Sequence, residues 1–94
     1  MPKYYPDKIY GYYLYYTEHC IVEAMHVHAS DKKLSEAGSA KFFVHGDGTT
    51  EVQKRGSLSD IDIKRIQRFI KEHYLEMYQR WSEDSENGFY EKSW

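Results

Sequence analysis

The stretch Ser59-Asp-Ile-Asp-Ile-Lys-Arg-Ile-Gln-Arg-Phe-Ile-Lys-Glu-His-Tyr-Leu-Glu-Met-Tyr-Gln-Arg-Trp81 decides the fold of this chain. Apolar residues recur along it at intervals of three or four positions, with charged residues between them, which is the period of one helix face. Ser59 is a favourable N-cap residue, and Asp60 and Asp62 place negative charge near the positive helix end. The sequence therefore predicts one amphipathic helix over residues 59–81, whose apolar face must cover another element.

Four shorter segments ahead of this helix have the composition of β-strands. They comprise residues 9–18, 25–30, 39–45 and 50–55, in which aromatic and β-branched residues are frequent. Asp47-Gly48 marks a tight turn between the last two segments, because both residues tolerate positive φ angles. Strands followed by one helix, with short connections, indicate an α+β fold. We expect a small antiparallel sheet of about four strands, with one long C-terminal helix packed on one face.

The length and composition of the chain favour a single domain. We expect an N-terminal tail over residues 1–8, a core of sheet and helix over residues 9–81, and an acidic C-terminal tail over residues 82–94. Cys20 is the only cysteine, so no internal disulfide bond can form. No run of apolar residues is long enough for a signal peptide or a membrane span. These features are typical of a cytoplasmic protein with no membrane partner.

Tyrosine is unusually frequent, with ten residues in the chain. In the first predicted strand Tyr10, Tyr12 and Tyr16 share one face, and Tyr13 and Tyr15 share the other. Only one face can pack against the helix, so the other presents rings to solvent, to a neighbouring segment or to a partner. Since a tyrosine ring buries apolar area while its hydroxyl stays polar, Tyr10, Tyr12 and Tyr16 are candidate partner-binding residues. Ordinary pairing with the next strand is the alternative.

His26 and His28 form the sharpest local motif. Residues i and i+2 of a strand lie on one face, about 6–7 Å apart, so the two imidazoles can contact one anion, respond to pH, or share a metal ion with His19. The spacing His-x6-His-x-His is not that of a familiar zinc site, and we expect neither a metal nor another cofactor. Histidines at the solvent edge of a small sheet are the alternative.

Basic residues concentrate in the middle of the chain. Residues 32–71 carry nine basic and five acidic side chains, whereas the net charge of the chain is −2. Arg65 and Arg68 stand one helical turn apart, Lys64, Arg68 and Lys71 form a similar row, and Lys54-Arg55 precede the helix. With tyrosines nearby, such groups can contact RNA. No nucleic-acid-binding motif is present, and solvated faces are the alternative.

Two segments, Gly11-Tyr-Tyr-Leu-Tyr-Tyr16 and Met25-His-Val-His-Ala29, resemble those of a bacterial family called domain of unknown function 4160. Its members are similar in their order of elements: a Met-Pro start, an aromatic strand, a His-x-His strand, a hairpin, and a helix that ends near a tryptophan. The typical member has a Pro-Pro pair before the His-x-His, where this chain has Glu23-Ala-Met25. The resemblance implies a cytoplasmic bacterial protein, often encoded beside a small partner in a proposed toxin–antitoxin pair. The resemblance implies no agreed catalytic residues. The motif residues that it shares with the family are His26 and His28, and His19 resembles a histidine that members often carry ahead of that pair.

Three functions remain open on this basis. The first is a protein-binding module that pairs with a cognate protein encoded nearby, as one component of a toxin–antitoxin pair; a homodimer is also compatible. The second is an RNA-contacting or RNA-cleaving toxin, with histidines as acid and base and cations on phosphate. The third is a structural or accessory domain. The sequence favours the first, a role without catalysis. The candidate binding residues are Tyr10, Tyr12, Tyr16, His19, His26, His28, Lys54, Arg55, Arg65 and Arg68.

Overall fold

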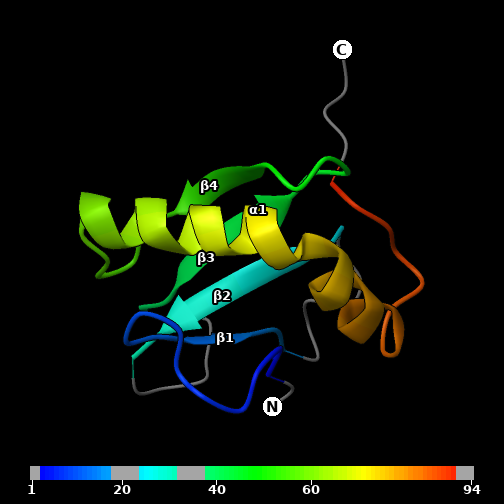
Figure 1. Cartoon of the computed structure of the whole chain (residues 1–94), viewed down its shortest axis with the longest axis horizontal. Coiled ribbons are helices and arrows are strands. Elements are labelled where there is room, and N and C mark those ends of the chain that lie inside the picture. Colours follow the sequence, from blue (N-terminus) through cyan, green and yellow to red (C-terminus); the bar gives the residue numbers. More distant parts are fainter. Residues whose placement is uncertain (1–2, 18–23, 32–37, 91–94) are drawn as a thin grey trace.

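The computed structural model describes residues 3–17, 24–31 and 38–90, which form a four-stranded sheet crossed by one long helix (Figure 1). The elements are β1 (Tyr13–Tyr15), β2 (His26–Ser30), β3 (Ala40–Val44), β4 (Thr50–Lys54) and α1 (Asp60–Ser82). Each strand pairs antiparallel with the next, in the order β1-β2-β3-β4. The α+β arrangement predicted from the sequence is confirmed. Within the described ranges, no helix has the length and apolar character needed to cross a bilayer.

The helix begins and ends close to the predicted residues. Ser59 has an extended backbone, and its hydroxyl accepts a hydrogen bond from the Asp62 amide at 3.2 Å. That contact satisfies one of the amide groups that the first helical turn leaves without a partner. At the other end, the Glu83 amide donates to the Arg80 carbonyl at 3.3 Å. The N-cap inferred from the sequence therefore sets the helix start.

The core lies between α1 and the sheet face turned toward it. The helix contributes its predicted stripe to this core, and every second residue of β2 and β3 meets it, as alternation along a strand requires. Burying each large apolar side chain in such a core stabilises the fold by roughly 1.5–3 kcal/mol. The fully or nearly fully buried members are Tyr4, Leu14, Tyr16, Met25, Val27, Ala29, Ala40, Phe42, Val44, Leu58, Ile63, Ile66, Ile70, Met77 and Trp81.

The first strand is much shorter than predicted. Ile9 and Tyr12 exchange two backbone hydrogen bonds of 2.7 and 3.1 Å around Tyr10-Gly11, whose φ angles are 51° and 88°. Two successive positive φ angles make a two-residue hairpin turn of the kind that suits antiparallel strands. The prediction of one strand over residues 9–18 is therefore wrong in its first part, because the chain reverses direction at Tyr10.

The described parts of both terminal segments, expected as tails, lie against the sheet. The Tyr4 amide donates to the Leu14 carbonyl at 2.8 Å, and the Tyr4 ring belongs to the core. After the helix, the Gly88 carbonyl accepts from the Met25 amide at 2.9 Å. The Phe89 ring stacks on Tyr78 with a centroid distance of 4.2 Å. Residues 3–8 and 83–90 thus close the two ends of the core.

Candidate functional site

His26 and His28 lie side by side on β2, as their i, i+2 spacing predicts, with ring centroids 5.2 Å apart. Both are almost fully buried, however, with exposed fractions of 0% and 2%. The His26 ring lies 5.5 Å from the rings of Trp81 and Phe43. The expectation that the histidines stand at a solvent edge is therefore wrong, because aromatic rings from distant segments enclose them.

The surroundings of His28 keep its imidazole neutral. Burial, followed by the positive charges of His26 and Lys41, lowers the pKa of His28 to about 4. Its ring stacks on Tyr15 at 5.6 Å, and its Nδ1 atom lies 3.2 Å from Ser39 Oγ. At neutral pH this ring carries no proton to donate as an imidazolium, so it does not suit the acid half of an acid–base pair.

The metal hypothesis involved His19, which lies outside the described residues. Among residues 3–17, 24–31 and 38–90, no three histidine, cysteine, aspartate or glutamate side chains gather as metal ligands would. Nδ1 of His26 lies 2.8 Å from the carbonyl oxygen of Ala24. One nitrogen of this ring is thus engaged with the backbone.

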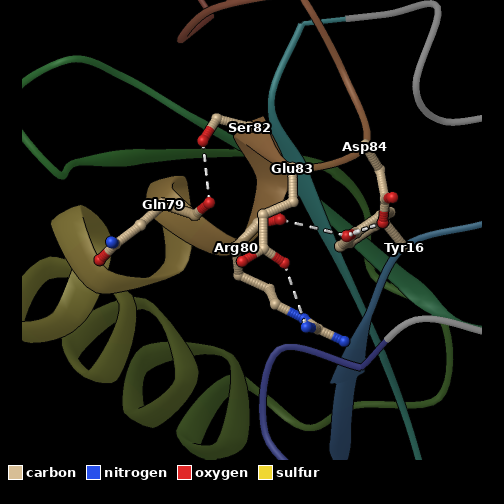
Figure 2. Close-up of polar contacts among 6 residues, drawn as sticks. All are labelled: Tyr16, Gln79, Arg80, Ser82, Glu83 and Asp84. Atoms are coloured by element: carbon tan, nitrogen blue, oxygen red, sulfur yellow. Dashed lines mark hydrogen bonds and ion pairs between the residues drawn. The ribbon is translucent and has the colours of Figure 1, made fainter.

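Tyr16 belongs to the core and contacts the end of α1. It is fully buried, and its ring meets Trp81 edge-on at 5.2 Å. Its hydroxyl donates to the Asp84 carboxylate at 2.5 Å and lies 3.3 Å from the carbonyl oxygen of Arg80 (Figure 2). Burial and then the bond to Asp84 raise the pKa of Tyr16. Figure 2 also shows the contacts of Arg80 with Glu83 and of Ser82 with Gln79 that close the helix end.

Tyr12 and Tyr10 lie in the hairpin before β1, next to the start of α1. The Tyr12 hydroxyl donates to the Asp62 carboxylate at 2.7 Å, which together with partial burial raises the pKa of Tyr12. Tyr10 is 54% exposed, and its ring lies 5.9 Å from the guanidinium of Arg65. Of the three tyrosines expected to bind a partner, Tyr10 is exposed, Tyr12 is half-buried and Tyr16 is fully buried. The predicted exposed tyrosine face does not exist, because Leu14, Tyr15 and Tyr16 are all fully buried.

Of the four cations predicted to bind an anion, Lys54 is the one whose charge acts on the histidines, where it helps to lower the pKa of His28. Arg65 and Arg68 lie in the first half of α1, whereas His26 packs against Trp81 in the last turn of the same helix. Arg65 is 3.9 Å from Asp62, and Arg68 is 3.8 Å from Glu72. Lys54 faces Lys41 across the β3–β4 ladder. Arg55 forms an ion pair with Asp60. Of the cations proposed for RNA cleavage, Lys54 thus acts on the histidine pair, whereas Arg65 and Arg68 form ion pairs within α1.

The structure instead assembles a groove between β4 and the first half of α1. Two adjacent hollows of about 440 and 280 Å³ make up this groove and share Gln67. Arg55 and Lys64 line the first, and Arg68 and Lys71 line the second. Asp60 is the one acidic residue that lines either hollow. The full lining, which we call the basic groove, is Thr49, Thr50, Val52, Arg55, Asp60, Ile63, Lys64, Gln67, Arg68 and Lys71.

Sequence reasoning found part of the basic groove. Lys64, Arg68 and Lys71 are spaced to share one helix flank, and Arg55 was a candidate. Thr50, Val52 and Gln67 were missed, because nothing in their spacing says that β4 lies beside this flank of α1. Of the described strands, β4 ends the sheet on this side, so its outer edge borders the groove.

Comparisons with known proteins identify the family but add no activity. The searches of curated proteins and of solved structures gave no match. A family model described as Domain of unknown function (DUF4160) matches residues 10–82, which include all four strands and the whole of α1. The match spans the His-x-His strand, the basic groove and the helix end at Trp81. The chain therefore belongs to the DUF4160 family.

Proposed function

We propose that this protein is a protein-binding module, and that the basic groove binds an acidic segment of its partner. The observation that supports this proposal is the charge of the groove. Four basic residues and one acidic residue line it, in a chain whose net charge is −2. Such a local concentration of positive charge attracts an anionic partner and orients its approach.

The charges of the groove are only weakly compensated. Lys64 has no ion-pair partner within the described part of the chain. The Lys71 ammonium donates to the backbone carbonyl of Asp47 at 2.9 Å, and its charge also helps to lower the pKa of the fully exposed Asp47 carboxyl, so this cation is only partly compensated. Arg68 and Glu72 are both largely exposed, and an exposed pair at 3.8 Å contributes little. Asp60 is already engaged by Arg55. A partner carboxylate can therefore gain from these cations.

The partner we propose is a small protein encoded beside this one, with which it would form a toxin–antitoxin pair in the cytoplasm. The resemblance of the motifs to the DUF4160 family supports this choice. A second copy is a poor occupant of the same groove, because two copies docked groove to groove would bring like charges together. An RNA strand is also less suited, since none of the residues lining the groove has an aromatic ring on which a base can stack.

The test compares two charge reversals with the same effect on net charge. Lys64→Glu changes the groove, and Lys8→Glu changes an exposed lysine beside Tyr13. The probe is a fluorescent ten-residue peptide of alternating glutamate and threonine, and binding is followed by anisotropy at low and physiological salt. We expect Lys64→Glu to weaken binding about tenfold and Lys8→Glu to change it by less than about twofold.

Equal losses in the two variants would mean that binding follows net charge alone, and the groove would not be the site. No binding of the peptide by the unmodified protein at low salt would overturn the proposal. A single-stranded RNA of the same charge is the third arm of the experiment. Tighter binding of the RNA than of the peptide, with a steep salt dependence, would make the partner a nucleic acid instead.

A further inference from the structure

We propose that the acidic segment binds as a fifth strand on the outer edge of β4, with every second side chain facing the cations of α1. This inference rests on the proposed function and specifies how the partner is recognised. Addition of an extended peptide to a sheet edge gives affinity through main-chain hydrogen bonds and specificity through alternate side chains. Three features of the edge support it.

The backbone of β4 offers groups that the sheet does not use. The His45 amide donates to the Thr49 carbonyl at 2.8 Å, so Thr49 directs its backbone groups toward β3. In an antiparallel ladder, successive residues direct theirs to opposite sides, and Thr50 and Val52 therefore point theirs outward. No described residue forms a backbone hydrogen bond with these outward groups. They can pair with an incoming strand.

The same two residues line the basic groove. Thr50 borders the hollow that contains Arg68 and Lys71, and Val52 borders the one that contains Lys64. Side chains of an added strand that stand opposite Thr50 and Val52 would point to the helix side of the sheet, as their neighbours do. Those side chains are two residues apart, about 6–7 Å. Lys64, Arg68 and Lys71 follow one another at about 6 and 4.5 Å along the helix axis, so two successive acidic side chains reach separate cations.

The opposite edge of the sheet, formed by β1, is already paired. There, Lys3 forms a bridge to Tyr15, and the Tyr4 amide donates to the Leu14 carbonyl, so the N-terminal segment pairs with β1. An edge strand left unpaired invites association and is usually blocked in some way. On β4 the ladder to β3 shifts register between Lys41 and Phe42, so the pairing is irregular toward Lys54. Thr50–Val52 is the regular part that remains for pairing.

The experiment separates strand addition from simple charge attraction by using two probes. The first is the alternating glutamate–threonine peptide. The second is the same peptide with the backbone nitrogens of its glutamates methylated, which keeps its charge but removes the amide donors that would face β4. We expect the methylated peptide to bind the intact protein at least about tenfold more weakly. We also expect hydrogen exchange of the Thr50 and Val52 amides to slow by about tenfold or more when the unmodified peptide saturates the protein.

A protein variant gives an independent check. Val52→Pro removes one outward donor without touching the ladder to β3, and proline is tolerated on an edge strand in that orientation. It should lower affinity for the unmodified peptide by a much larger factor than affinity for the methylated one. Equal binding of the two peptides, with no protection at Thr50 and Val52, would overturn strand addition while leaving the proposed function intact. Failure of the unmodified peptide to bind would overturn both.

Discussion

The phenolic hydroxyl of Tyr16 donates a 2.5 Å hydrogen bond to the carboxylate of Asp84, which joins the segment after β1 to the turn after α1 (Figure 2). The ring of the same tyrosine meets Trp81 edge-on at 5.2 Å. Sixty-eight positions separate the two hydrogen-bonded residues in the sequence. This contact therefore fixes the last turn of the helix against the edge of the sheet opposite the basic groove.

Tyr16→Phe should lower the free energy of unfolding by about 1–2 kcal/mol, because it removes a hydrogen bond to a charged group and keeps the ring contacts. Urea unfolding measures the difference. Tyr13→Phe is the matched control, since Tyr13 is only half-buried and its ring contacts Lys3 and Lys8 from the exposed side. If the two variants lose the same small amount, the bond to Asp84 contributes nothing measurable.

The buried His28 predicts a loss of stability in mild acid. Its pKa is about 4 in the folded protein, where burial, His26, Lys41 and Lys54 all disfavour the charged form, and about 6.5 when the chain unfolds. The unfolded chain therefore binds the proton more readily. Stability is fully present above pH 6.5 and falls as the pH drops toward 4, by up to about 1.4 kcal/mol per pH unit from this group.

His28→Asn removes this titration and keeps a polar atom near Ser39 Oγ. Free energies of unfolding measured across the same pH range should fall less steeply for the variant than for the unmodified protein. The comparison concerns the slopes, so a constant loss of stability in the variant does not affect it. Parallel slopes would show that His28 accepts a proton as easily in the folded protein as in the unfolded one.

Tyr10 occupies a backbone conformation that disfavours its side chain. Its φ angle is 51°, a value that asparagine and glycine adopt at a lower energetic cost than tyrosine. Tyr10→Asn should therefore raise the free energy of unfolding by about 0.5–1 kcal/mol, even though the exposed contact with Arg65 is lost. Gly11→Ala, in the same turn with φ 88° and open space around its added carbon, should lower it by about 1 kcal/mol. A loss of stability in Tyr10→Asn would contradict this account of the turn.

The helix start offers a prediction with a close control. Ser59→Ala removes the hydroxyl that accepts the Asp62 amide and should cost about 1 kcal/mol of stability. Ser57→Ala, two residues earlier in the exposed turn before α1, should change stability by less than about 0.5 kcal/mol. Urea unfolding measures the change in the free energy of unfolding for both variants. Equal effects of the two substitutions would mean that the cap does not set the stability of the helix.

The elements with a regular apolar pattern were predictable. The stripe from Ile63 to Trp81 and the Ser59 cap placed the helix within one residue at each end. Alternation along β2 and β3 assigned Val27 and Phe42 to the core, because successive side chains of a strand point to opposite faces. These patterns are local, and tertiary contacts reinforced them.

The rest depended on contacts between distant segments. The turn at Tyr10 was hidden because tyrosine rarely adopts a positive φ angle, and Gly11 alone marked it. The burial of His26 and His28 depends on rings supplied by Tyr15, Phe43 and Trp81, which no spacing relates to the histidines. Helical spacing predicted that the cations of the basic groove share one flank of α1. It could not predict that the edge of β4 lies beside them, because that depends on how α1 packs on the sheet.

The measurement that tests the central claim most directly is an NMR titration of the isotope-labelled protein with the alternating glutamate–threonine peptide. The account predicts that the largest amide shifts fall on both walls of the basic groove, at Thr50 and Val52 on β4 and at Lys64, Gln67 and Arg68 on α1. Shifts centred on the hairpin at Tyr10, or spread evenly over all exposed lysines and arginines, would contradict it.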